Sequence, residues 1–361
     1  EGTHIEENFF KTALWRNATH PDADEMNIAG TDYIFWTLLI LLILSIFAAA
    51  AVLLVFFLIR LYAQLTCGMY EEKTRMDGKT VIVTGCTSGI GKETARELAK
   101  RGARVIMACR NLELAEKVKD EILKDVKDAK LEIKKLDLSS FSSIREFAAD
   151  IIKTEPKLDV LIHNAGYAQT FKKYKTEDGL EMTMATNHYG PFLLTHLLIT
   201  LLRKSTPSRI VVVASSLYRL ASFNFDNPNP LTTMPGYLYY ASKEANILFT
   251  KELARRLEGT GVTANCLHPG LIDTGIWNNV PAPLSWPLRL VNKCFFKTPI
   301  QGCQTTVMLA TDENLLKVSG KYFSDCQESS LSNAASDMSR ARKLWEISEK
   351  LVQLEENDPR I

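Results

Sequence analysis

Three tyrosines stand just upstream of a lysine in the stretch YLYYASKEANILF, which begins at Tyr237. Tyr239 and Lys243 are four residues apart, so a helix would place both side chains on one face, one turn apart. An ammonium held near a phenol lowers the phenol's pKa from about 10, so that the phenol can donate and recover a proton near neutral pH. The spacing therefore selects Tyr239 as a proton donor, although an isolated pair is more often helix packing. Tyr237 and Tyr240 are expected to form pocket wall or packing.

Two further polar positions support the tyrosine and lysine pair. Ser216 ends the apolar run VVVASS, where its hydroxyl could hold a carbonyl oxygen of a substrate, and the adjacent Ser215 is the alternative. Asn187 lies in MATNHYGPF, inside the preceding helical stretch. It could bind a water that connects Lys243 to solvent, or it is a locally bonded helix residue.

A glycine-rich turn precedes these residues in the stretch TVIVTGCTSGIGKETARELAKRG, which reads as strand, turn and helix. Gly85, Gly89 and Gly91 would let the backbone turn tightly and approach a pyrophosphate at the N-terminus of the helix. A glycine triplet alone is a weak signal, because any tight turn from strand to helix needs such residues. Its place after the first strand of an alternating pattern strengthens the prediction of a dinucleotide site.

Candidate contacts for the rest of a dinucleotide follow the next three strands. Arg110 stands where a binder of unphosphorylated dinucleotide usually has an acid, which favours a 2′-phosphate and hence NADP(H), with a solvated arginine as the alternative. Asp137, in LDLSS, could accept from an adenine amino group or cap the following helix. Asn164, Ala165 and Gly166 end a later strand in a small-residue turn that lets a cofactor lie across the sheet edge.

The elements that must position these residues alternate along the chain from residue 79 onward. Apolar β-branched runs such as TVIVTG, ARVIMAC and SRIVVVASS are typical of parallel strands covered on both faces. Amphipathic stretches between them predict helices at 92–101, 112–127, 141–153, 183–202 and 239–257. The pattern predicts an α/β fold with a doubly wound, Rossmann-like parallel sheet in a single catalytic domain.

Composition excludes several other classes of protein. The 361 residues carry a formal net charge of +1 without long blocks of like charge, so we expect no nucleic acid partner. The seven cysteines are scattered and form neither a CxxC motif nor a cluster with histidine. This favours a reducing compartment and argues against a disulfide framework and a metal site.

One segment is too apolar for a soluble domain. From Tyr33 to Ile59 there are 27 uncharged residues, which is long enough for a tilted transmembrane helix. We therefore expect a polar tail at 1–32, an anchor at 33–60, a linker at 61–78 and the catalytic domain at 79–361. Basic residues follow the span, and acidic residues with a single sequon at Asn17 precede it. This bias predicts a catalytic domain that faces the cytosol, in a single-pass protein of the endoplasmic reticulum.

Six motifs occur in a fixed order: T-G-x-x-x-G-I-G, N-A-G, Asn, Ser, Y-x-A-S-K and H-P-G. Together they resemble the short-chain dehydrogenase/reductase family over the chain from about residue 79. The runs ACRNLELAE, LHPG and GKYFSDC are similar to the membrane-associated retinol dehydrogenase group within it. The resemblance implies a catalytic set of Ser216, Tyr239 and Lys243, completed by Asn187. It implies cofactor contacts from Gly85, Ser88, Gly89, Ile90, Gly91, Arg110, Asp137, Asn164, Ala165, Gly166, Lys243, Pro269, Gly270 and Thr274.

The sequence departs from the family pattern at several places. An insertion rich in asparagine and proline, NFDNPNPLTTMPG, lengthens the interval between the serine and the tyrosine, as in the retinol group. His163 replaces the more usual asparagine before the N-A-G motif. Residues 275–299 fall where the family builds a substrate lid, and their apolar side chains could line a pocket, touch a bilayer, or simply pack on the domain.

The expected function is reversible hydride transfer between NADP(H) and the carbonyl or alcohol group of a lipophilic substrate in a membrane. A retinoid is favoured by the resemblance alone, and a steroid or a fatty aldehyde is the alternative within the family. An alternative of another class is a membrane-tethered nucleotide-binding protein without catalysis. The sequence does not decide whether the protein forms a homodimer.

Overall fold

The computed structural model describes residues 23–169, 172–272 and 296–361. The chain forms two compact units, Glu1–Gln64 and Leu65–Ile361, and each is described by itself. The substrate lid expected at 275–299 and the cofactor contact expected at Thr274 fall almost entirely outside the described residues.

The first unit is dominated by one long helix, α2 (Ala23–Leu65). Its portion Asp32–Tyr62 has a mean hydropathy of 3.2 and is long and apolar enough to cross a membrane. The described side chains of this portion are almost all exposed. The helix contains the whole expected anchor at 33–60 but begins earlier, inside the segment expected to be a tail.

The second unit contains one sheet with the strand order β3-β2-β1-β4-β5-β6-β7-β8. Seven strands are parallel, and β8 pairs antiparallel with β7. The strands are β1 (Thr80–Thr84), β2 (Arg104–Cys109), β3 (Lys130–Lys135), β4 (Val160–His163), β5 (Ser208–Val213), β6 (Val262–His268), β7 (Tyr322–Ser324) and β8 (Gln327–Glu328). The order reverses between β1 and β4, which is the point where such sheets bind ligands beyond the carboxyl ends of their strands.

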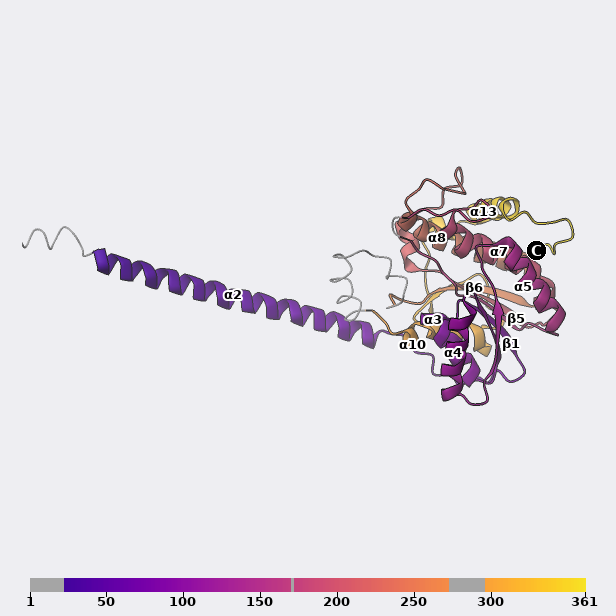
Figure 1. Cartoon of the computed structure of the whole chain (residues 1–361), viewed down its shortest axis with the longest axis horizontal. Helices are drawn as coiled ribbons and strands as arrows, with labels where there is room; N and C mark the ends of the chain where they lie inside the picture. The colour runs from indigo at the N-terminus through magenta and orange to yellow at the C-terminus, as the bar shows by residue number, and fades with distance from the viewer. Residues whose placement is uncertain (1–22, 170–171, 273–295) are drawn as a thin grey trace, which may run out of the picture. The chain divides into compact units, whose positions relative to one another are not determined.

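Helices cover both faces of the sheet, as the apolar runs predicted. They are α3 (Gly89–Lys100), α4 (Leu112–Asp125), α5 (Phe141–Thr154), α6 (Met182–Met184), α7 (Gly190–Lys204), α8 (Pro235–Arg256), α10 (Pro299–Gly302), α11 (Gln304–Thr311), α12 (Asn333–Ser336) and α13 (Met338–Leu351). Short turns of other helix types are η1 (Ala185–Tyr189), η2 (Ser216–Leu220) and η4 (Glu313–Leu315). In Figure 1, α5, α7, α8 and α13 lie on one side of the strands, and α3 and α4 lie on the other.

In the central strands, alternate side chains pack into two separate cores on the two faces of the sheet. In β1, Ile82 joins the core under α5, α7, α8 and α13, whereas Val81 and Val83 join the core under α3, α4 and α11. Burial on both faces explains why the strands read as continuous apolar runs and not as alternating ones. The predicted doubly wound α/β fold is thus confirmed.

Element boundaries differ from the expectation where backbone geometry intervenes. The stretch expected as one helix at 183–202 is broken by the π-helical turn η1, which contains Asn187. Helix α8 begins at Pro235, one turn before Tyr239, because a proline near the first position of a helix has no hydrogen bond to lose.

The segment expected to be a linker is attached to the second unit. The Gly68 N–H donates to Asp325 Oδ1 at 3.3 Å, and the Met76 N–H donates to the Arg101 carbonyl oxygen at 2.7 Å. Met76 is buried, and Tyr70 packs against the core beneath α3. The ordered domain therefore starts about ten residues before the expected boundary at residue 79.

Candidate active site

A cavity of about 830 Å³ opens beyond the carboxyl ends of the central strands. It is lined by residues that follow β1, β2, β3, β4, β5 and β6, together with the first turns of α8. Thirteen of the fourteen expected cofactor residues line it, and the remaining one, Thr274, lies outside the described residues. The lining residues among them are Gly85, Ser88, Gly89, Ile90, Gly91, Arg110, Asp137, Asn164, Ala165, Gly166, Lys243, Pro269 and Gly270.

The glycine turn needs its glycines for space as well as for backbone conformation. Gly85 has a φ of 72°, and a Cβ there would stand 2.8 Å from the Ala165 Cα. A Cβ at Gly91 would overlap the Asn164 side chain and the Gly85 carbonyl. Asn164 in turn holds the turn, because its Nδ2 donates to the carbonyl oxygens of Thr84 at 2.9 Å and of Gly85 at 3.3 Å.

Thr84 is a residue that the sequence reasoning missed. Its hydroxyl accepts from the backbone N–H groups of Asn164 and Ala165, both at 3.0 Å, and donates to the Ile162 carbonyl oxygen at 3.3 Å. The side chain thereby ties the end of β1 to the end of β4 across the reversal point of the sheet. Its position directly before Gly85 was the available signal, but a strand threonine is too common to single out.

The first turn of α3 points its N-terminus into the cavity. The N-cap residue Ser88 is extended and makes no side-chain hydrogen bond to the turn. The first backbone N–H groups of a helix have no partner within the helix, and they carry the positive end of its dipole. This arrangement fits the pyrophosphate of a dinucleotide, which supplies the acceptors that the helix lacks.

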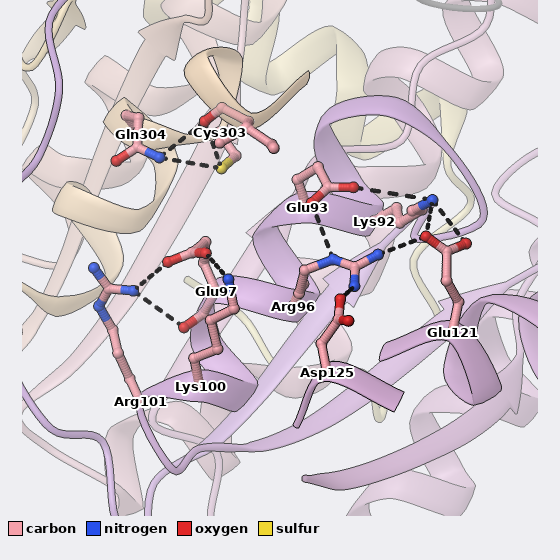
Figure 2. Close-up of polar contacts among 11 residues, drawn as sticks. Lys92, Glu93, Arg96, Glu97, Lys100, Arg101, Glu121, Asp125, Cys303 and Gln304 are labelled. Atoms are coloured by element: carbon pink, nitrogen blue, oxygen red, sulfur yellow. Dashed lines mark hydrogen bonds and ion pairs between the residues drawn. The ribbon is translucent and has the colours of Figure 1, made fainter. Parts of the chain in front are cut away.

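A cluster of charged residues holds α3 against α4 (Figure 2). Arg96, on α3, donates to Glu121 at 2.7 Å and to Asp125, both on α4, and to Glu93 at 3.1 Å. Its side chain is 9% exposed, and Lys92 also pairs with Glu121. The cluster fixes the helix whose first turn faces the cavity.

Two of the expected cofactor contacts, Arg110 and Asp137, differ in whether other residues of the chain already bind their side chains. Arg110 is exposed, and it makes no ion pair with any carboxylate in the described part of the chain. Asp137 Oδ1 accepts from the Ser139 N–H at 2.9 Å and from its hydroxyl at 2.6 Å, so Asp137 braces its own loop. Ser140, and not Asp137, caps α5. Arg110 is therefore the group available to a phosphate.

Tyr239 and Lys243 meet at the other end of the cavity, as their spacing predicted. Lys243 is buried, and its Nζ donates to the Val213 carbonyl oxygen at 2.8 Å and lies 5.6 Å from the centroid of the Tyr239 ring. A Cβ on Gly166 would stand 3.7 Å from the same Nζ. Tyr240 also lines the cavity, whereas the hydroxyl of Tyr237 bonds to the backbone of Ser222.

The pKa values differ from the sequence expectation. Burial raises the pKa of the Tyr239 phenol to about 12, and a hydrogen bond with Ser215 opposes only part of that rise. Burial also lowers the pKa of the Lys243 ammonium to about 8. The expected lowering of the tyrosine pKa by the lysine is not found, because desolvation of the phenol is the larger effect. Near neutral pH, the site thus holds a protonated phenol beside an ammonium.

The two candidate serines of the site, Ser215 and Ser216, have different surroundings. Ser215 lines the cavity and hydrogen-bonds with Tyr239, and its hydroxyl accepts from the Leu217 N–H at 3.2 Å. Ser216 begins η2 and does not line the cavity. Both serines lie beyond the end of β5, Ser215 as the N-cap of η2 and Ser216 as its first residue. Of the two alternatives that the sequence leaves open, this geometry favours Ser215.

Asn187 is buried beside the cavity and does not line it. Its Oδ1 accepts from the Tyr167 N–H at 2.7 Å, and its Nδ2 donates to the Tyr167 carbonyl oxygen at 2.9 Å and to the Ser242 hydroxyl at 3.0 Å. Both amide hydrogens are thereby used, which leaves little capacity for the expected relay water. Asn187 instead holds Tyr167, a residue of the cavity wall, against α8.

Comparisons with known proteins agree with this arrangement. A sequence model of the family described as short chain dehydrogenase matches residues 79–284, more than half of the chain. Retinol dehydrogenase 14 of Homo sapiens is 48% identical over 295 residues, which cover 77% of this chain and 88% of that protein. Retinol dehydrogenase 11 of Homo sapiens is 44% identical over 291 residues, which cover 80% and 91%.

Solved structures show the same fold. An uncharacterized protein from Mycobacterium paratuberculosis superposes with a TM-score of 0.63 at 31% identity and covers 78% of this chain and 96% of its own. A short chain dehydrogenase from Shigella flexneri, in complex with NADP, has a TM-score of 0.56 at 25% identity and covers 71% and 100%. The chain therefore belongs to the short-chain dehydrogenase family and is an oxidoreductase similar to the retinol dehydrogenases.

Proposed function

We propose that the protein is a membrane-anchored, NADP(H)-dependent oxidoreductase that interconverts the carbonyl and alcohol forms of a lipophilic substrate, with retinal and retinol as first candidates. The observation that carries the proposal is the convergence of Ser215, Tyr239 and Lys243 on the cavity that also contains the glycine turn. A proton donor and a dinucleotide site in one cavity are what carbonyl reduction requires.

The residues act on the carbonyl oxygen of the substrate. NADPH, when bound, supplies the hydride to the carbonyl carbon. The hydroxyls of Ser215 and Tyr239 both donate hydrogen bonds to the oxygen, which stabilises the negative charge that develops there. Tyr239 then transfers its Oη proton to that oxygen, and the Lys243 ammonium stabilises the phenolate that is left.

The choice of NADP(H) rests on Arg110. Its guanidinium is exposed at the end of β2, where it can bind a 2′-phosphate in a bidentate manner. Arg110→Ala should raise the KM for NADPH at least about tenfold and leave the KM for NADH unchanged, because one charge-assisted contact is lost. An equal change for both cofactors would contradict this assignment.

The choice of a membrane rests on α2, whose portion Asp32–Tyr62 is long and apolar enough to cross a bilayer and exposes most of its apolar side chains. The excess of basic residues after this portion supports a catalytic domain on the cytosolic side, and the endoplasmic reticulum is the membrane we propose. Cytosolic NADPH would then favour reduction. Resistance of the full chain to alkaline carbonate extraction, with protease-sensitive sites beyond residue 65 in sealed microsomes, would support both points.

Substitution of the proton donor tests the chemistry. Tyr239→Phe should abolish carbonyl reduction while NADPH binding, measured by nucleotide fluorescence, stays as in the wild type. Tyr240→Phe is the matched control, because it removes a neighbouring cavity hydroxyl and should retain most of the rate. Ser215→Ala should reduce the rate by roughly a hundredfold, and Ser216→Ala should not. A fully active Tyr239→Phe variant would overturn the assignment.

A substrate panel tests the substrate class. We would measure NADPH consumption with all-trans-retinal, a steroid ketone and a long-chain aldehyde in parallel. Retinal should give the highest kcat/KM. A higher value for either of the other two would reassign the substrate within the lipophilic class. NADPH binding without turnover of any of them would favour a nucleotide-binding protein without catalysis.

A further inference from the structure

The chain that leaves α2 attaches to the second unit within a few residues. A Cβ at Gly68 would overlap the Asp325 carbonyl, so the backbone at Gly68 lies directly on the turn between β7 and β8. Both residues of this turn, Asp325 and Cys326, have positive φ values of 51° and 59°. Positive φ at both residues is the ordinary conformation of a two-residue hairpin turn, so the turn has a defined shape against which Gly68 packs.

This docking point lies beside the cavity. Asp325 pairs with Lys297 as well as with Gly68. A Cβ on Gly270, a cavity residue, would stand 2.7 Å from the Lys297 side chain. The contacts run from Gly68 through Asp325 and Lys297 to Gly270, so the tether joins the domain at the edge where the cavity is found.

Three large apolar side chains are exposed around the docking point. We call Met69, Leu271 and Ile300 the apolar rim, and they are 49%, 44% and 54% exposed. Leu271 lines the cavity, and its carbonyl oxygen accepts from the Lys297 N–H at 2.8 Å. Gln304 links the other two, because it accepts from the N–H of Tyr70, next to Met69, and donates to the Ile300 carbonyl oxygen at 2.8 Å.

We propose that the apolar rim rests on the lipid surface of the membrane that holds α2, so that the cavity takes its substrate from the lipid phase. This inference rests on the proposed function, in which α2 anchors the protein in a membrane. Only residues 63–67 separate the apolar portion of α2 from Gly68, a reach of at most about 20 Å, so the rim cannot move far from the bilayer. Isolated exposed apolar residues are ordinary, but three around one tether are not.

The chemistry of the rim favours neutral lipid over an anionic surface. Glu71, Glu72 and Lys73 are all exposed next to Met69, so this stretch has no net positive charge, and Lys297 is already paired with Asp325. Apolar burial, and not charge, must then drive the contact. We therefore expect docking on phosphatidylcholine vesicles that does not weaken in high salt.

Photocrosslinking tests the contact without reference to catalysis. The full chain is reconstituted in phosphatidylcholine vesicles with Ile300→p-benzoylphenylalanine, and Ile152→p-benzoylphenylalanine serves as the control, since Ile152 on α5 is 53% exposed and remote from the tether. Illumination should attach phospholipid at position 300 and not at 152, as read by mass spectrometry. The proposal is overturned by absence of a lipid adduct at 300, by equal labelling at both positions, or by crosslinks to a second copy of the chain.

Kinetics test the consequence for substrate entry. The double variant Met69→Glu with Ile300→Glu should lower kcat/KM about tenfold for a carbonyl dissolved in the vesicles, because charged side chains oppose contact with lipid. It should leave kcat/KM unchanged for a short, water-soluble aldehyde, and Ile152→Glu should change neither. Equal loss for both substrates would point to damage at the active site and contradict the inference.

The two proposals fail in distinguishable ways. If the wild type reduces neither carbonyl, the proposed chemistry fails, while the crosslinks at position 300 still decide the docking. If alkaline carbonate releases the full chain from vesicles, the anchor fails and the docking proposal fails with it. If the rim variant matches the wild type on the vesicle substrate, the docking proposal alone fails.

Discussion

Arg96 and Lys243 are both buried cations of the catalytic domain, and their surroundings are opposite. Arg96 lies between α3 and α4 among Glu93, Glu121 and Asp125 (Figure 2). Burial alone would lower its pKa, but these carboxylates outweigh burial and raise it. Lys243 pairs with no carboxylate among the described residues, and its hydrogen-bond acceptor is the Val213 carbonyl oxygen. Burial lowers its pKa to about 8.

The difference separates a structural charge from a catalytic one. A buried cation matched by carboxylates joins two helices, and removal of one member leaves the others uncompensated. A buried cation without a carboxylate destabilises the fold, so its presence beside a cavity points to a role in binding or catalysis. Arg96 and Lys243 should therefore respond oppositely to the same substitution by methionine.

The largest expected effect is on catalysis. Lys243→Met should lower kcat/KM for carbonyl reduction by roughly a thousandfold, because the phenolate of Tyr239 loses its stabilising charge. Arg96→Met should change it by less than about threefold at a temperature where the protein is folded. Steady-state NADPH oxidation measures both. A large loss of kcat/KM in Arg96→Met would contradict the distinction between a structural and a catalytic charge.

The second effect is a gain of stability on removal of the lysine. The folded pKa of Lys243, about 8, lies below its unfolded value of 10.5. Below pH 8 the buried ammonium therefore destabilises the folded state by about 3 kcal/mol, and this penalty disappears as the pH rises from 8 to 10.5. Lys243→Met should raise the free energy of unfolding at pH 7, with the gain shrinking toward pH 10.5. Denaturant unfolding of the full chain in detergent at several pH values checks this, and a pH-independent gain would contradict it.

The third effect is a loss of stability at the charged cluster. Arg96→Met should lower the free energy of unfolding by about 2 kcal/mol, less than for a fully buried pair because Glu121 and Asp125 are half exposed. Arg75→Met removes a fully exposed pair with Asp77 and should produce no measurable change. The two variants are compared by denaturant unfolding. Equal changes in the free energy of unfolding would mean that burial of the charged cluster does not stabilise the fold.

The smallest effect is the pH dependence of the rate. Tyr239 stays protonated throughout the accessible range, whereas Lys243 loses its proton near pH 8. The kcat/KM for reduction should then be flat below pH 8 and fall about tenfold per pH unit above it. Lys243→Arg, which stays charged, should remove the fall even if its overall rate is low. A wild-type profile without a break near pH 8 would show that another group controls the rate.

Much of the fold and the site could be predicted from local patterns. Apolar runs and amphipathic stretches predicted the doubly wound sheet, because strands buried on both faces read as continuous apolar runs and the helices that cover them are amphipathic. The spacing of Tyr239 and Lys243 predicted their shared helix face, because helix geometry is local. The glycine turn was predicted for the same reason, since Gly85 needs its positive φ wherever that turn is built.

Other features depend on contacts between distant residues. Ser215 and Ser216 are indistinguishable in the sequence, and the cavity and the Tyr239 phenol are needed to tell their surroundings apart. The Asn187 amide binds the backbone of Tyr167, twenty residues away in the chain, which no local pattern indicates. The attachment of Gly68 to Asp325 joins segments 257 residues apart, so no local pattern could predict it.

The sequence by itself thus determined the fold class, the apolar anchor segment, the glycine turn and the tyrosine and lysine pair. All of these follow from the chemistry of neighbouring residues and from fixed helix and strand periods. Only the tertiary structure shows which serine lies beside the Tyr239 phenol, which groups hold the Asn187 amide, how burial affects the pKa of Tyr239, and where Gly68 docks. These depend on how far each group is removed from water and which distant partner it meets, and neither quantity is encoded in local spacing.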